Sequence, residues 1–133
     1  MAERSFAKEV EDLKIGAGET FRGEGILAIT KALLENGVGY VAGYQGSPIS
    51  HLMDVLADAQ EFLSEFGVHF EASTSEATAA ATLAASVHYP IRGAVTFKST
   101  VGTNVASVAS ANLASGGVTG GALVIVGEDY GEG

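Results

Sequence analysis

The 133-residue sequence contains no cysteine, only two prolines and few basic residues. The absence of cysteine excludes disulfide bonds and any iron–sulfur cluster held by this chain, and it favours a reducing, cytoplasmic compartment. Seven Lys and Arg residues stand against sixteen Asp and Glu, which gives a net charge of −9. A surface of that sign repels phosphate groups, so we expect neither nucleic acid nor an anionic membrane as a partner.

Targeting segments and common motifs are also missing. The N-terminal MAERSFAKEVEDLK has no apolar run of the signal-peptide type, and Gly, Ser, Thr or Asn interrupts every apolar stretch before it could span a bilayer. GxGxxG, P-loop and GxSxG motifs are absent. His51, His69 and His88 do not have the spacing of metal ligands, so we expect no metal site built from this chain alone.

The composition is that of a folded domain in which apolar strands alternate with helices. Hydrophobic residues make up 47% and charged residues 17% of the chain. Residues 1–22 are polar and acidic and are expected to form a loosely held arm, followed by a domain over 23–133. Helices are predicted at 23–37, at 49–67, within the alanine-rich 72–90 and at 102–115, with strands at 38–44, 68–72, 92–99 and 120–129.

Continuous apolar strands that alternate with helices predict an α/β domain, in which a parallel sheet has helices on both faces. Such sheets bind ligands beyond the carboxyl ends of their strands. Four loops then share the functional edge, namely 45–48, 71–76, 98–104 and 127–133. The sequence stops about one loop after the fourth predicted strand, so the domain is expected to be incomplete at its C-terminus.

Two of the predicted helices carry no Asp, Glu, Lys or Arg apart from Glu76 at the start of one of them. Such residues are absent from 77–91 and from 99–127. A helix on the surface of a monomer normally has a charged face, so we expect a partner chain to cover these segments. The alternative is that their Ser, Thr and Asn residues present a neutral polar face to water.

Glu76 is the single carboxylate at the head of the alanine-rich helix. The run Ser73-Thr74-Ser75-Glu76 matches a capping box, in which an N-cap hydroxyl and the carboxylate three residues later satisfy free backbone N–H groups. The carboxylate also interacts favourably with the positive end of the helix dipole. The alternative is a buried acid or base at a strand–helix turn, with a pKa tuned for chemistry.

Four segments carry a family resemblance. GYQGSPIS, SEATAAATLAA, TFKSTVGTN and GGALVIVGED occur in the order found in the pyrimidine-binding, N-terminal domain of thiamine-diphosphate-dependent 2-oxoacid:ferredoxin oxidoreductases. The sequence resembles that family over roughly residues 20–133 and looks most like the alpha subunit of its indolepyruvate branch. The resemblance implies the thiamine-diphosphate-binding fold and thiamine diphosphate as cofactor.

The resemblance also implies roles for individual residues. In that family a glutamate that matches Glu76 hydrogen-bonds N1′ of the aminopyrimidine and so helps the cofactor's 4′-amino group to remove the C2 proton. Glu76 is therefore the implied catalytic and cofactor-binding residue. Ser47 matches the hydroxyl residue that contacts the substrate carboxylate, and Lys98 is a second candidate for that contact. Gly46 and Asn104 are candidates for cofactor binding.

Each of these weaker candidates has a structural alternative. Ser47 is also suited to a turn or a helix cap, and Gly46 to a tight turn. Lys98 is suited to a solvated strand end, and Asn104 to the start of a helix.

Two departures from the family pattern narrow its implications. Pyruvate-specific relatives have an arginine in the loop after the fourth strand, where this sequence has Glu128 and Asp129. That difference disfavours pyruvate and fits an aryl-pyruvate. The magnesium–diphosphate motif, Gly-Asp-Gly followed by Asn, is absent. In this family the motif lies on another domain, so the chain would hold only the aminopyrimidine half of the cofactor.

The implied function is the pyrimidine-binding module of an enzyme that oxidatively decarboxylates a 2-oxoacid to an acyl-CoA. Mg²⁺ and iron–sulfur clusters would lie on partner domains or subunits, one of which binds the diphosphate, and ferredoxin would accept the electrons. We expect a homo-oligomer and an isolated chain without activity. Two alternatives stay open: a subunit of a non-oxidative thiamine-diphosphate decarboxylase, and a non-catalytic interaction subunit with the same fold.

Overall fold

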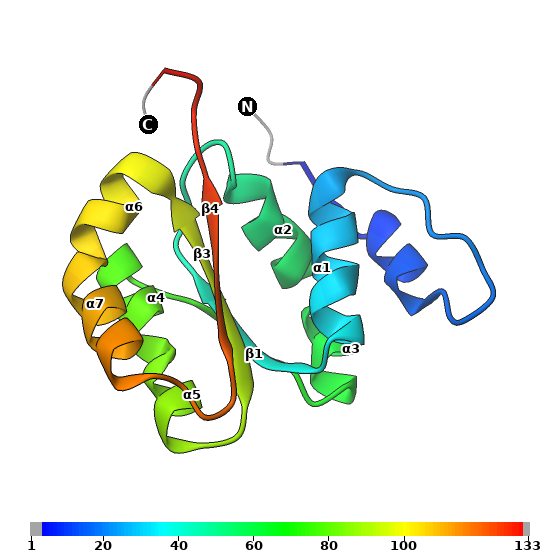
Figure 1. Cartoon of the computed structure of the whole chain (residues 1–133). Helices are drawn as coiled ribbons and strands as arrows, with labels where there is room; N and C mark the ends of the chain where they lie inside the picture. The colour runs from blue at the N-terminus through cyan, green and yellow to red at the C-terminus, as the bar shows by residue number, and fades with distance from the viewer. Residues whose placement is uncertain (1–3, 132–133) are drawn as a thin grey trace.

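A four-stranded parallel sheet forms the centre of the molecule in the computed structural model, which describes residues 4–131 (Figure 1). The strands are β1 (Val38–Gly43), β2 (His69–Ala72), β3 (Arg92–Lys98) and β4 (Ala122–Gly127). They are hydrogen-bonded in the order β2-β1-β3-β4, and every neighbouring pair is parallel. All four predicted strands are present.

Helices cover both faces of this sheet, which confirms the predicted α/β class (Figure 1). One face carries α1 (Gly25–Glu35), α2 (Ser50–Asp58) and α3 (Gln60–Glu65), and a short 3-10 helix, η1 (Glu9–Lys14), contacts α1. The other face carries α4 (Glu76–Thr82), α5 (Ala84–His88), α6 (Ser99–Val105) and α7 (Ser107–Gly116). None of the helices within residues 4–131 is both long and apolar enough to span a lipid bilayer.

Three predicted helices are each divided in two. The breaks fall at Ala59, Leu83 and Ala106, where ψ lies between −14° and 2°. All three residues are buried, so each break lets the chain bend around the core and keeps the apolar residues of both halves packed. No glycine or proline occupies these positions, which is why the sequence pattern predicts continuous helices.

The sheet separates two hydrophobic cores because side chains along a strand point alternately to its two faces. On β1, Val41 faces the cluster beneath α1 and α2, whereas Ala42 faces the cluster beneath α4. The same alternation places Ala94 and Val95 of β3 in different clusters. The functional edge therefore has two sides, one next to α2 and one next to α4.

The N-terminal segment is packed, which corrects the expectation of a loosely held arm. Phe6, Val10 and Leu13 are almost fully buried in the core cluster beneath α1 and α2. The Phe6 N–H donates to Asp58 Oδ2 at 2.5 Å. The three apolar residues are spaced four and three apart, so they lie on one side of a helical turn and bury together. The proposed domain boundary near residue 22 stays a prediction.

The two uncharged segments differ in how far this chain covers them. Ala79, Ala80 and Leu83 are buried because α4 contacts β1, β3, α6 and α7 of the same chain. The expectation that a partner chain is needed to cover these three residues was therefore wrong. By contrast α7 has no buried residue, and Val108 is 71% exposed. Coverage of α7 by a partner stays a prediction.

Strand β4 forms one edge of the sheet and is exposed on both faces. Leu123, Val124 and Val126 are each more than a third exposed, and β4 has only β3 as a neighbour among residues 4–131. Parallel strands are normally buried on both faces, so β4 has the composition of an interior strand in an edge position.

Candidate functional site

The loops at the carboxyl ends of β1, β2 and β3 are tied together by backbone hydrogen bonds. The Tyr44 N–H donates to the carbonyl of Thr96 at 3.0 Å, and the Ser73 N–H donates to the carbonyl of Gly43 at 2.8 Å. These hydrogen bonds therefore fix the starts of three of the four predicted edge loops relative to one another.

Helix α4 starts with Glu76 as its first residue, and Ser75 is its N-cap. Ser75 Oγ accepts a hydrogen bond from the Thr78 N–H at 3.1 Å. The predicted capping box between Ser73 and Glu76 was therefore wrong. Because its N–H donates to Gly43, Ser73 extends the hydrogen bonding between β2 and β1 by one residue, and the helix begins only after it.

The Glu76 side chain is buried and has no protein partner. The residue is 9% exposed, and no hydrogen bond or ion pair is made to its carboxylate among residues 4–131. Three residues earlier, Ser73 Oγ is also buried without a partner. Buried polar groups are normally hydrogen-bonded because burial without a partner costs free energy. The start of α4 thus holds a buried hydroxyl and the carboxylate of a largely buried glutamate, both of which a ligand could satisfy.

Ser47 and Gly46 lie in the turn between β1 and α2. The Ile49 N–H donates to the carbonyl of Gly46 at 3.0 Å, and the Ser47–Pro48 peptide bond is cis, as in a type VI turn. Ser47 is exposed in this turn, whereas the N-cap of α2 is Ile49, so the cap alternative for Ser47 was wrong and the turn alternative is confirmed. The substrate contact of Ser47 stays a prediction.

The turn lies against the end of β3. A Cβ atom at Gly46 would be 2.8 Å from Cβ of Lys98, so glycine permits this close approach. Lys98 itself is not a solvated strand end, because its Nζ is 2.7 Å from Oδ2 of Asp129. A substrate carboxylate would have to share or displace this ion pair.

Asp129 was missed as the partner of Lys98, although the parallel register contains the signal. Lys98 pairs with Gly127, so the side chain of a residue two positions beyond Gly127 can reach back to it. Asn104 lies near the end of α6, and its Nδ2 donates to the carbonyl of Thr100 at 2.7 Å. The alternative that Asn104 starts a helix was wrong, and its cofactor contact stays a prediction.

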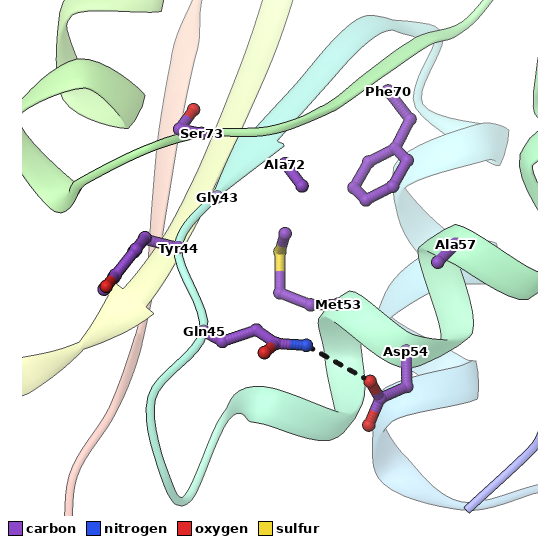
Figure 2. Close-up of a pocket in the computed structure, with 9 residues that line it drawn as sticks. All are labelled: Gly43, Tyr44, Gln45, Met53, Asp54, Ala57, Phe70, Ala72 and Ser73. Carbon is purple, nitrogen blue, oxygen red and sulfur yellow. Dashed lines mark hydrogen bonds between the residues drawn. The ribbon is translucent and has the colours of Figure 1, made fainter. Parts of the chain in front are cut away.

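A cavity of about 390 Å³ opens on the α2 side of the same edge. Figure 2 shows Met53 extending from α2 toward Ala72, with Phe70 beside them and the Gln45 amide reaching toward Asp54. The complete lining consists of Gly43, Tyr44, Gln45, Met53, Asp54, Ala57, Phe70, Ala72 and Ser73.

Two polar residues of the lining, Gln45 and Asp54, are hydrogen-bonded to each other, and His51, which does not line the cavity, contacts Asp54. Gln45 Nε2 donates to Asp54 Oδ1 at 3.5 Å, and His51 Nδ1 lies 3.0 Å from Asp54 Oδ2. Of these residues only Gln45 belongs to a predicted edge loop. Met53 and Asp54 were missed because a helical pattern gives the buried face of α2 but not the side of the sheet edge that this face approaches.

Within residues 4–131, no three or more His, Asp and Glu side chains are grouped so that they could hold a metal ion.

Comparisons with known proteins place the chain next to one set of relatives. It is 34% identical over 122 residues to indolepyruvate oxidoreductase subunit IorA of Methanothermobacter marburgensis, a match that covers 91% of this chain and 19% of that protein. It is 35% identical over 102 residues to the IorA subunit of Pyrococcus abyssi, covering 77% of this chain and 15% of that protein.

The chain thus spans less than a fifth of the length of these two relatives. No family model matches the sequence, and the comparison with solved structures found no match. The resemblance carried by the four sequence segments is confirmed by these relatives, and by sequence the chain belongs to the indolepyruvate ferredoxin oxidoreductase alpha-subunit family.

Proposed function

We propose that the chain is the pyrimidine-binding module of a thiamine-diphosphate-dependent 2-oxoacid:ferredoxin oxidoreductase that acts on an aryl-pyruvate such as indolepyruvate. The relationship to subunits named for indolepyruvate oxidoreductase supports the enzyme class and the substrate. The observation that carries the cofactor assignment is the largely buried Glu76, which lies at the carboxyl edge of the sheet and accepts no hydrogen bond from residues 4–131.

An aminopyrimidine fits the groups present at the start of α4. Its protonated N1′ is a donor, and Glu76 is a buried acceptor that has no other hydrogen bond among the described residues. When bound, thiamine diphosphate supplies a carbon nucleophile for attack on the 2-oxo carbon. The role of Glu76 is to hold a proton at N1′, and its burial strengthens this interaction because little water competes. The Ser73 hydroxyl is a second candidate contact for the ring.

The rest of the reaction would need groups outside this chain. The sequence has no magnesium–diphosphate motif and no cysteine for iron–sulfur clusters, so a partner domain or subunit would supply both. In this proposal the complex releases CO₂, passes two electrons through its clusters to ferredoxin and transfers the acyl group to coenzyme A. Ser47 and Lys98 would contact the substrate carboxylate, and Gly46 and Asn104 would line the cofactor.

Glu76→Gln in the complete enzyme complex tests the proposal. The variant keeps the size of the side chain and one acceptor but removes the group that holds the proton. We expect turnover to fall by about 10² to 10⁴, the usual contribution of a positioned acid or base. Hydrogen–deuterium exchange at cofactor C2 should slow with it, whereas cofactor affinity should change little.

Glu71→Gln is the matched control, because Glu71 is an exposed carboxylate on β2, the strand that directly precedes α4. We expect this variant to keep both turnover and C2 exchange. Equal exchange rates in the wild-type and Glu76→Gln complexes would overturn the role of Glu76. Absence of thiamine diphosphate from the purified complex would overturn the proposed function as a whole.

The isolated chain provides a second test. With the diphosphate ligands on another polypeptide or domain, we expect isothermal titration to detect weak binding of thiamine diphosphate or none. Tight, magnesium-dependent binding by this chain alone would contradict the division of the cofactor between two domains.

A further inference from the structure

The cavity next to α2 has a composition that the cofactor does not explain. Of the two groups at the start of α4 that are proposed to contact the cofactor, Ser73 lines the cavity and Glu76 does not. In Figure 2 the Tyr44 side chain points away from Met53. The cavity walls are the thioether of Met53, the ring of Phe70 and the methyl groups of Ala57 and Ala72. Such an apolar recess with a few polar groups at one side is the usual form of a small-molecule site.

We propose that this cavity receives the aromatic side chain of the 2-oxoacid and that Asp54 accepts a hydrogen bond from an indole N–H. The inference rests on the proposed function, because it assigns the side-chain pocket of the same reaction. It adds the residues that would distinguish an indole from other side chains. Gln45, Ala72 and Ser73 belong to the predicted edge loops, whereas Met53, Asp54, Ala57 and Phe70 lie outside them.

The size and the walls of the cavity suit a planar bicyclic ring. A volume of about 390 Å³ is at the small end of the range for ligand pockets and exceeds what a methyl or isopropyl group would fill. Thioether and aromatic groups make favourable contacts with a second aromatic ring. Gly43 helps to keep this space open, because a Cβ atom there would be 2.4 Å from Met53 Sδ and would push that side chain into the cavity.

Asp54 determines which end of the substrate can enter. Its side chain is 20% exposed, and its Oδ2 lies 3.0 Å from His51 Nδ1. Among the described residues Oδ1 accepts only one long hydrogen bond, at 3.5 Å from Gln45 Nε2, so this oxygen can accept another donor. A negative charge on the wall repels a carboxylate and attracts an N–H group. The substrate carboxylate would therefore stay outside the cavity, on the side of the turn that contains Ser47, while the ring enters.

The experiment uses the holoenzyme complex and two unreactive analogues, indole-3-lactate and 3-phenyllactate, which differ in the indole N–H and in ring size. Calorimetry gives their Kd values, and steady-state kinetics give KM for indolepyruvate and phenylpyruvate. For Asp54→Asn we expect indole-3-lactate to bind about tenfold more weakly, because a neutral acceptor replaces a charged one. Binding of 3-phenyllactate should change less than about twofold, since it has no donor to lose.

Glu61→Gln is the control for the change of charge, because Glu61 is exposed on α3 and does not line the cavity. Ala57→Leu tests the cavity itself, since three added carbon atoms would occupy part of it. We expect this variant to weaken both analogues by about tenfold or more. Ala28→Leu, at an exposed position of α1, is the matched control and should leave both unchanged.

Separate readouts distinguish the two possible failures. If the wild-type complex oxidises no 2-oxoacid in the presence of coenzyme A and an electron acceptor, the proposed function is wrong. If it oxidises indolepyruvate but Ala57→Leu leaves both the Kd and the KM values unchanged, another part of the protein holds the side chain. If Asp54→Asn affects both analogues equally or neither, Asp54 does not recognise the indole N–H.

Discussion

Ser75 has the largest local role at the start of α4, although Ser73 and Thr74 offer the same chemistry. Ser75→Ala removes the hydroxyl that accepts from Thr78, and we expect it to lower the free energy of unfolding by about 1 kcal/mol. Ser73→Ala removes a buried hydroxyl without a partner, so it should be neutral or slightly stabilising. Urea denaturation of the two variants measures both effects, and a larger loss for Ser73→Ala would restore the capping box.

The role of a single residue could be predicted only where the contacts that decide it lie close to it in the sequence. A capping box is a local pattern, and it favours Ser73 because only that hydroxyl has a glutamate three residues later. The bond from Ser73 to Gly43 joins residues 30 positions apart, and it prevails because the sheet ladder already fixes the backbone there. Asp54 and Met53 were missed for a similar reason, since the cavity is formed by β1, β2 and α2 together.

Strands β1 and β3 are linked to α5 by one buried side chain. The Tyr40 hydroxyl lies 2.7 Å from Ser86 Oγ, and Ser86 Oγ donates to the carbonyl of Ile91 at 2.7 Å. The Tyr40 ring covers Gly93, where a Cβ atom would lie 1.9 Å from the ring. Glycine at this position therefore lets the two strands and α5 share one hydrogen-bonded contact.

Gly93→Ala tests this link between elements. The added methyl group must displace the Tyr40 ring, so we expect a loss of about 1–3 kcal/mol in the free energy of unfolding. Gly116→Ala is the matched control, because Gly116 ends α7 with no atom near its added Cβ. That variant should be neutral or stabilise by up to about 1 kcal/mol. Comparable denaturation midpoints for the two variants would contradict the packing of Tyr40 on Gly93.

At the scale of elements, the strands were predictable and the divisions of the helices were not. Each strand is a continuous apolar run between turn residues, so its sequence alone indicates a buried parallel strand. The breaks at Ala59, Leu83 and Ala106 depend instead on how each helix must bend to follow the core. The packing of residues 6–13 was predictable in principle, because Phe6, Val10 and Leu13 have helical spacing within an otherwise polar segment.

The charge of the whole molecule is distributed unevenly. The net charge is −9, yet no Asp, Glu, Lys or Arg occurs in 99–127, which includes the exposed α7. The negatively charged surfaces of two such chains repel each other, so a contact between chains is least opposed where the surface carries no charge. We therefore expect α7 to lie against a partner domain or subunit in the assembled enzyme.

Val108→Glu tests this expectation, because Val108 is the most exposed of the valines on α6 and α7. A carboxylate buried in an interface without a partner should weaken assembly by at least about tenfold. Gln60→Glu adds the same charge on α3, which lies on the other face of the sheet, and should assemble normally (Figure 1). Sedimentation velocity of the two complexes measures the difference, and identical sedimentation would contradict a covered α7.

The exposed edge of β4 has a consequence for handling this domain in isolation. Its free backbone N–H and C=O groups form a template onto which a strand of another molecule can add, and no charged or proline residue of β4 opposes such growth. Aggregation of the isolated chain should therefore be seeded at this edge and rise steeply with concentration. Val124→Lys should delay it, whereas the wild-type chain should stay in solution if a partner domain or subunit covers this edge.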